Sequence, residues 1–285
     1  MNYRIETYSS CQRFNGQYQD IYSFLLNAGK LAYNEHFHWG RFAWMQTHSM
    51  LEKEKLTTIA MFKDEREQIV GMTTFDTCYD DRVYLIHTTD DEDLLNLMID
   101  TVLQNEEGSA TIKVNSRDEA LARVLQKRGF HRKQKDFSML ALDLRCDLEY
   151  ELPDGYSISP EGFIMDNWQY QLVIHRGFDN EGIPEKWEDA AFAGVDRQIK
   201  TFALSDGAYC AHCGLWYTEG ETAYVEPVAT IPEHRQKGLA RAVVYEACKR
   251  AKNSGAKRAI VLSDQAFYYK IGFKLSSEVY CWEED

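Results

Sequence analysis

No stretch of the sequence approaches the 18 or so consecutive apolar residues that a membrane-spanning helix requires. The amino terminus, M-N-Y-R-I-E-T, lacks the apolar core of a signal peptide. The seven cysteines are scattered and odd in number, which is typical of reduced thiols rather than of a disulfide framework. We therefore expect a cytoplasmic protein.

An excess of positive charge is also absent. The 45 acidic and 32 basic residues give a formal net charge of −13, spread over both halves of the chain. Such a surface repels nucleic acid and anionic membranes, so we expect neither as a partner. It suits a small cationic acceptor such as an amine.

The length of 285 residues predicts two domains. The segment Glu149–Gly155, with its proline and glycine, is the natural linker between residues 1–148 and 149–285. Periodicity in the first half predicts helices at 20–33, 91–104 and 117–127, and strands at 3–8, 56–62, 68–75, 82–88, 110–114 and 138–144. The second half predicts helices at 165–175, 185–194 and 264–270, and a further helix that follows Ala240 and stops at Gly255. It predicts strands at 156–159, 200–205, 208–217, 224–230, 259–263 and 279–282.

The stretch Tyr224–Arg241 organises the second half. Its first seven residues predict a buried strand with a bulge or kink at Glu226-Pro227. A short basic turn and Gly238 then open an amphipathic helix. The first N–H groups of a helix lack partners and carry a partial positive charge, so this joint predicts an anion site. The alternative is an ordinary strand–loop–helix joint with a solvated basic turn.

The first half differs from the second at the corresponding joint. There the sequence T-D-D-E-D, residues 89–93, places four consecutive carboxylates and no glycine. These would repel a pyrophosphate. The halves share a terminal signature, R-G-F at 128–130 and I-G-F at 271–273. The first half is therefore expected to be a structural copy without a nucleotide site.

These residues resemble the GNAT superfamily of acetyl-CoA-dependent N-acyltransferases. R-Q-K-G-L-A at 235–240 matches the family's R/Q-x-x-G-x-G/A pyrophosphate loop, E-P-V-A-T-I-P at 226–232 its fourth strand, and Y-Y-K-I-G-F at 268–273 its late Y-x-K-x-G-F signature. The resemblance implies an α/β (α+β) fold of two tandem GNAT-like domains. Each would be a mixed, mostly antiparallel twisted sheet flanked by helices, and the first copy would be degenerate.

The resemblance also implies how acetyl-CoA is held as a co-substrate. Backbone groups of the fourth strand would pair with the pantetheine arm, and the amides of the loop would bind the pyrophosphate. The implied binding residues are Val228, Ala229, Thr230, Arg235, Gln236, Lys237, Gly238, Leu239, Ala240 and Arg241. A backbone N–H near Ala229 would polarise the thioester oxygen.

Acetyl transfer to an amine requires a base and a proton source for the thiolate that leaves. Glu226, on the organising strand, is predicted as the base, directly or through water; alternatively it pairs with a cation or binds the acceptor's ammonium group. Tyr268 lies where the family often keeps a tyrosine that protonates the thiolate, and alternatively it packs in the core. The corresponding residue of the first half, Leu125, has no proton to give.

Other motifs carry less chemistry. C-A-H-C at 210–213 lies in a strand-like run, where residues i and i+3 face opposite sides, so no metal site is expected. The aromatic segment His36–Trp44 predicts packing, with an acceptor-cleft wall as the alternative. The spacing of a P-loop is absent, which argues against ATP. The sequence thus predicts an N-acetyltransferase for a primary amine; the alternative is a non-catalytic acyl-CoA-binding regulatory or sensor protein.

Overall fold

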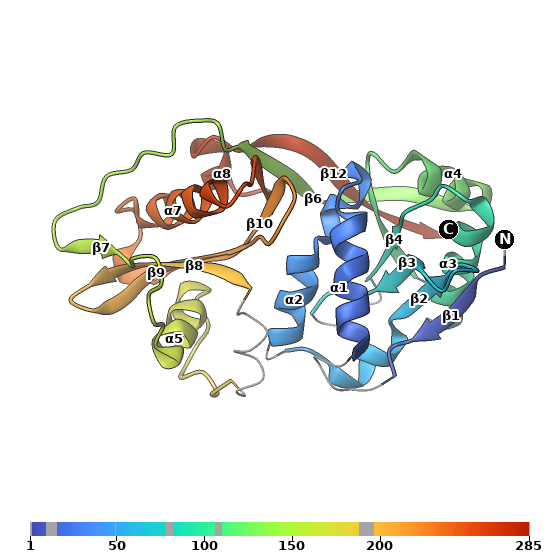
Figure 1. Ribbon diagram of the computed structural model, residues 1–285, viewed down its shortest axis with the longest axis horizontal. Helices are drawn as coiled ribbons and strands as arrows, with labels where there is room; N and C mark the ends of the chain where they lie inside the picture. The colour runs from blue at the N-terminus through green and yellow to red at the C-terminus, as the bar shows by residue number, and fades with distance from the viewer. Residues whose placement is uncertain are drawn as a thin grey trace. The chain divides into compact units, whose positions relative to one another are not determined.

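The computed structural model describes residues 2–9, 16–48, 50–77, 82–105, 110–187 and 197–284 (Figure 1). The chain forms two compact units. Unit 1 comprises Met1–Met139, Leu262–Asp264 and Leu275–Asp285, and unit 2 comprises Leu140–Val261 and Gln265–Lys274. The division differs from the predicted boundary at residue 148, because each half of the sequence gives its terminal segment to the other unit.

Unit 1 contains a mixed, mostly antiparallel sheet in the order β1–β2–β3–β4–β5–β12–β6. Its strands are β1 (Arg4–Thr7), β2 (Ala60–Lys63), β3 (Ile69–Thr74), β4 (Arg82–His87), β5 (Thr111–Asn115), β12 (Lys274–Glu284) and the first part of β6 (Phe130–Asp143). Only β4 and β5 pair in parallel among the pairs whose registers are given. The predicted hairpin of residues 56–75 is therefore present as β2 and β3.

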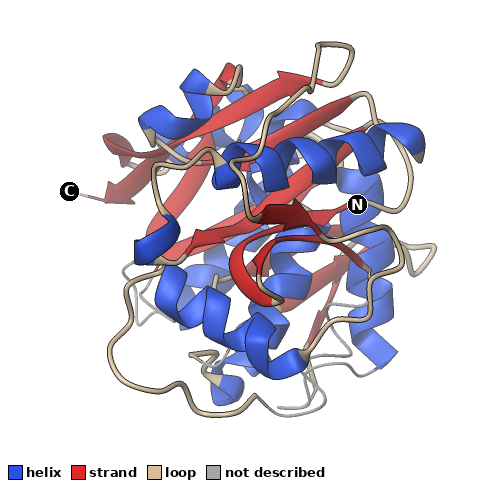
Figure 2. Cartoon of the chain, turned by 90° about the vertical axis from the view of Figure 1, so that its left-hand side faces the viewer, coloured by secondary structure: helices blue, strands red, loops and turns tan. Residues whose placement is uncertain are grey.

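Helices, drawn blue in Figure 2, accompany the strands of unit 1 as well. They are α1 (Gly16–Ala28), η1 (Ala32–Phe37), α2 (Trp39–Thr47), η2 (Lys53–Thr58), α3 (Glu92–Asn105) and α4 (Glu119–Lys127). The aromatic segment His36–Trp44 is buried, and its rings pack against Tyr18, Tyr22 and Tyr84 within unit 1. This is the packing role that the sequence favoured.

Unit 2 contains the sheet β6–β11–β10–β9–β8–β7. Its strands are β7 (Tyr156–Ile158), β8 (Gln198–Ser205), β9 (Ala208–Trp216), β10 (Thr222–Thr230) and β11 (Arg258–Leu262), and its helices are α5 (Asn167–Gly177), η3 (Pro232–His234), α7 (Leu239–Asn253) and α8 (Ala266–Lys270). The predicted helix at 185–194 falls largely outside the described residues, and 185–187 have no regular structure.

The longest helix of unit 2, α7, packs on β8, β9 and β10 (Figure 1). Leu239, Val243, Ala247 and Ala251, each four residues apart, form its buried stripe. Burying the larger of these side chains contributes about 1.5–3 kcal/mol each. The helix ends before Gly255, whose φ of +113° stops it where the sequence predicted. In the described part of the chain, no helix is long and apolar enough to cross a membrane.

The C-A-H-C motif lies in β9, and its histidine and last cysteine have different neighbours. His212 stacks on Phe202 and meets the edge of Tyr170, whereas Cys213 belongs to the core that α7 covers. Among the described residues, no group of three or more histidine, cysteine or carboxylate side chains could hold a metal ion.

The terminal strands correct one expectation. The sequence assigned residues 138–144 to the first half and 279–282 to the second. Instead, β12 pairs antiparallel with β5 from Val279↔Asn115 to Trp282↔Ile112, and Trp282 enters the core of unit 1. Residues 140–143 of β6 lie in unit 2, where Leu144 N–H donates to the carbonyl of Lys257. Apolar alternation fixes that a segment is a strand but not which strand it joins.

Candidate functional site

The joint between β10 and α7 presents a row of unpaired backbone donors. In the described structure, none of the N–H groups of residues 236–241 donates to an acceptor in the chain. Gln236 and Gly238 both have positive φ, +61° and +79°. Residues of this conformation within a turn direct successive N–H groups toward one side, which forms an anion-binding concavity at the positive end of the α7 dipole.

The backbone conformation at residue 238 favours glycine, and the space beside its Cα atom is empty. Its φ of +79° is one that residues other than Gly, Asn and Asp rarely adopt. A Cβ atom there would meet nothing within 4 Å. The neighbouring Leu239 is buried and anchors the start of the helix. The space beside the Cα atom of Gly238 is therefore open.

Two cationic side chains flank this concavity. Lys237 Nζ donates to the hydroxyl of Tyr156 at 2.9 Å. Arg241 donates to the carbonyl of Glu149 at 3.0 Å and lies over the ring of Tyr245. Since neither cation is paired with a carboxylate in these contacts, both leave positive charge beside the open amides.

Arg235 has partners that the sequence did not predict. Its guanidinium donates to both oxygens of Asp179 at 2.9 Å and to the carbonyls of Gly177 and Thr230 at 2.9 and 3.0 Å. Asp179 thus neutralises its charge. Arg235 therefore ties the loop to the end of α5.

Strands β10 and β11 separate in the middle of unit 2. They pair in parallel only over Thr222–Tyr224 and Arg258–Ile260, after which β10 continues to Thr230 beside β9. The gap between the two strands lies directly before the anion-binding loop. Separated strands offer the backbone groups on one edge of β10 to an extended ligand.

The hydrogen-bond pattern decides which backbone groups face the gap. Ile231 N–H donates to the carbonyl of Cys210 on β9, and facing pairs alternate along an antiparallel ladder. The N–H and C=O of Ala229 therefore face β9, and those of Val228 and Thr230 face the gap. This removes Ala229 from the predicted backbone contacts and from the predicted polarisation of the thioester. The Thr230 carbonyl already accepts from Arg235.

Glu226 lies at the predicted irregularity of β10. The register with β9 shifts between Val225 and Val228, and the peptide bond before Pro227 is cis. The half-buried Glu226 accepts a hydrogen bond from the hydroxyl of Tyr224 on its Oε2 atom at 2.5 Å. Its backbone carbonyl accepts from Gln198 Nε2 at 2.9 Å and from Trp216 Nε1 at 2.7 Å. Sequence reasoning missed these three partners, which come from three different strands.

Tyr268 is the middle residue of the short helix α8 and lies in the core of unit 2, 7% exposed. Its ring meets the edges of Phe267 and Phe273. Burial, reinforced by Cys213 and Glu226, raises the pKa of Tyr268 well above its ordinary value. The phenol therefore keeps its proton at neutral pH, within electrostatic reach of the Glu226 carboxylate.

The described residues of unit 1 have a different arrangement at the equivalent place. At the start of α3, Asp91 Oδ1 accepts from the N–H of Asp93, so the helix supplies its own anion. Beside β4, where β4 and β5 separate, Asn34 Nδ2 donates to the carbonyl of His87 at 2.7 Å. Leu125 is fully buried. The residues that would bind a pyrophosphate or donate a proton are replaced or satisfied internally.

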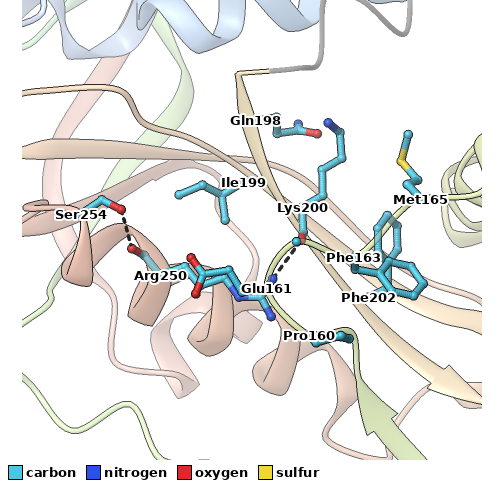
Figure 3. A pocket seen from close by; sticks show the side chains of 11 residues that line it. Pro160, Glu161, Phe163, Met165, Gln198, Ile199, Lys200, Phe202, Arg250 and Ser254 are labelled. Atoms are coloured by element: carbon cyan, nitrogen blue, oxygen red, sulfur yellow. Dashed lines mark hydrogen bonds between the residues drawn. The ribbon is translucent and has the colours of Figure 1, made fainter.

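A second hollow of unit 2, about 290 Å³ in volume, lies at the other end of α7 (Figure 3). Arg250 and Ser254 line one side of it, and Phe163, Phe202 and Met165 the other. It lies roughly 24 Å along α7 from Gly238, from the rise of 1.5 Å per residue. Arg250 donates to Glu246 and to the carbonyls of Ser159 and Lys200. The guanidinium of Arg250 is therefore already engaged by groups of unit 2, and we do not assign this hollow a ligand.

Comparison with known proteins agrees with this geometry. Residues 166–273 match the model of the Acetyltransferase (GNAT) family, a segment that contains β10, the loop and α7. Residues 166–273 are thus similar in sequence to GNAT acetyltransferases, and the fold of the chain is similar to that of a solved tandem GNAT protein. A search of curated proteins gives no match.

Solved structures share the fold at low identity. A GCN5-related N-acetyltransferase from Kribbella flavida has a TM-score of 0.52 at 17% identity, over 76% of this chain and 88% of that one. One from Sphaerobacter thermophilus has a TM-score of 0.55 at 11% identity, over 99% and 95%. A tandem GNAT protein from the clavulanic acid biosynthesis pathway has a TM-score of 0.57 at 12% identity, over 99% and 98%. The last two structures extend the similarity over both units.

Proposed function

We propose that the protein is an N-acetyltransferase that moves an acetyl group from acetyl-CoA to a primary amine, and that unit 2 carries the reaction. The observation that carries the proposal is the row of open N–H groups at residues 236–241, directly after the gap between β10 and β11. A row of donors suits a pyrophosphate, and a strand edge suits the amide-bearing pantetheine arm. The family match supports acetyl-CoA as the ligand.

Binding would use few side chains. The amides of Gln236–Arg241 would hold the pyrophosphate, with Lys237 and Arg241 adding charge. The outward backbone groups of Val228 and Thr230 would pair with the pantetheine, and the N–H of one of them would polarise the thioester. Arg235 would act indirectly, by fixing the loop on α5.

The chemistry would be direct attack. Glu226 would take a proton from the acceptor's ammonium group, directly or through water, since only the neutral amine is a nucleophile. The amine nitrogen would bond to the acetyl carbon as the carbon–sulfur bond breaks, and Tyr268 would give its proton to the thiolate. The proton that the nitrogen loses on becoming an amide would then restore the hydroxyl of Tyr268. Burial raises the pKa of Cys213 and of Cys248, so neither suits a covalent mechanism.

One site per chain is part of the proposal. The anion-binding place of unit 1 is filled by Asp91, and Leu125 replaces the tyrosine, so unit 1 is proposed as a degenerate copy. The net charge of −13 supports a cationic acceptor and argues against nucleic acid or a membrane as a partner. A cytoplasmic location is also part of the proposal. The second candidate, a non-catalytic acyl-CoA sensor, would need the loop but neither Glu226 nor Tyr268.

Calorimetric titration with acetyl-CoA, read for stoichiometry, tests binding. We expect one site per chain. Two sites would mean that unit 1 also binds, and no binding would overturn the proposal. Release of the CoA thiol in the presence of a panel of primary amines, such as spermidine, lysine and glucosamine, then separates the two candidates. Binding without acceleration by any primary amine would favour the sensor.

A further inference from the structure

Three buried side chains in one row across unit 2 converge on Glu226. Gln198 of β8 is the register partner of Trp216 of β9, which in turn is the partner of Tyr224 of β10. We call these three residues the donor row. Two of them donate to the Glu226 carbonyl, at 2.9 and 2.7 Å, and Tyr224 donates to the Glu226 carboxylate at 2.5 Å. Every member of the row thus bonds to the same residue.

The donor row compensates for the irregularity of β10. Pro227 has no N–H, and the register shift takes Glu226 out of the ladder with β9, so its carbonyl needs other donors. Gly214 makes room for them: a Cβ atom there would lie 2.7 Å from the Glu226 carbonyl oxygen and closer still to Gln198 Nε2. The Gln198 amide is itself held by the hydroxyl of Tyr170 at 3.4 Å.

The hydrogen bond from Tyr224 to the Glu226 carboxylate is not needed to satisfy the backbone at the bulge, because the Glu226 carbonyl already has two donors, Gln198 and Trp216. Tyr224 is 1% exposed, so its ring is fixed by packing and its hydroxyl has a fixed position. A hydroxyl that donates to a carboxylate stabilises the ionised form and limits the rotation of the side chain. A base has to be ionised and correctly oriented before it can accept a proton.

We propose that Tyr224 is a positioning residue for the general base: its hydroxyl orients the Glu226 carboxylate through Oε2 and keeps it ionised, while Gln198 and Trp216 hold the peptide that carries it. This proposal rests on the proposed function only in that Glu226 acts as the general base. The physical contact can be tested without any acceptor.

Carbon-13 NMR of glutamate-labelled protein tests the contact. The Glu226 carboxyl signal, assigned by its loss in Glu226→Gln, is followed against pH in the wild-type protein and in Tyr224→Phe. We expect the midpoint to rise by about one pH unit in Tyr224→Phe, a tenfold change in the ionisation constant, because one hydrogen bond to the charged form is lost. An unchanged midpoint would overturn the proposal.

Tyr150→Phe is the matched control. The hydroxyl of Tyr150 also donates to a glutamate of unit 2, Glu246, at 3.0 Å, on α7 rather than beside the proposed base. This variant should leave the Glu226 midpoint unchanged. If Tyr224→Phe does not fold, Glu226→Gln reports the same coupling from the other partner: the phenol of Tyr224 should then ionise at lower pH than in the wild-type protein.

Kinetics with the best amine of the panel tests the consequence. Tyr224→Phe should lower kcat about tenfold and move the acidic limb of the kcat/KM profile to higher pH, with the acetyl-CoA Kd unchanged. In a Glu226→Gln background the same substitution should have no further effect; an equal loss there would mean a purely structural tyrosine. If Glu226→Gln itself retains full activity, the base assignment fails while the NMR result stands.

Discussion

A negatively charged side chain at position 238 would test the proposed anion-binding loop most directly. Gly238→Asp adds a carboxylate among the open N–H groups of residues 236–241, where the pyrophosphate of acetyl-CoA would lie. Gly238→Asn adds a side chain of the same shape without charge. Asp and Asn both tolerate the φ of +79°, and neither meets a steric neighbour at Cβ, so the two variants should be equally stable.

The magnitude follows from charge and distance. Two like charges about 5 Å apart at an effective dielectric constant of about 20 repel by about 3 kcal/mol. That corresponds to more than 100-fold in Kd for one phosphate charge, before the lost hydrogen bonds are counted. Gly238→Asn should weaken binding by less than about tenfold, from crowding and ordering alone.

Isothermal titration of wild-type protein and both variants with acetyl-CoA, at low and high salt, is the assay. We expect Gly238→Asp to lose at least 100-fold in affinity and to regain part of it at high salt, where charges are screened. Equal affinities for the Asp and Asn variants would refute electrostatic binding at this loop. Thermal unfolding of both variants provides the check that each is folded.

Three further predictions concern unit 2. Tyr268→Phe should lower kcat about 100-fold and leave the Kd for acetyl-CoA within about twofold, by titration and thiol release; unchanged turnover would remove the tyrosine from the mechanism. Burial lowers the pKa of His212 to about 3. Below about pH 6.5 the imidazole is therefore protonated in the unfolded chain but neutral in the folded chain. The free energy of unfolding should fall by about 1.4 kcal/mol for each unit by which the pH is lowered. His212→Gln should remove that slope from urea unfolding between pH 6.5 and 4.5, and an identical slope would contradict it. Gly177→Ala should lower the unfolding free energy by about 1–3 kcal/mol, because its Cβ would lie 2.6 Å from that of Ala229; an unaltered melting temperature would show that α5 can move away.

How far the sequence predicts the site depends on how local each feature is. The bulge at Glu226-Pro227 and the helix start after Gly238 are both present, because a proline, a glycine and the residues beside them determine these conformations within a few residues. The satisfied start of α3 was equally readable from its run of carboxylates. The family signature added the order of elements around these points.

Side-chain partners were not readable in this way. Arg235 lies in the predicted motif, but its partner Asp179 lies 56 residues earlier, and only the approach of α5 to β10 brings them together. The donor row joins residues 198, 216 and 224, which meet only through the registers of three strands. Hydrogen-bond alternation likewise decided that the backbone of Ala229 faces β9, since a one-residue change of register would reverse it.

The sequence by itself determined most of the helices and strands, the turn that precedes α7 and the difference in charge between the two halves at this joint, because propensity, turn chemistry and local charge act over a few residues. Only the tertiary structure decided which sheet β12 joins, where the charge of Arg235 goes and which groups hold Glu226. A strand's alternating side chains fix its two faces, but its edges are backbone groups that any strand shares. The choice of partner is therefore made by the packing of the whole unit.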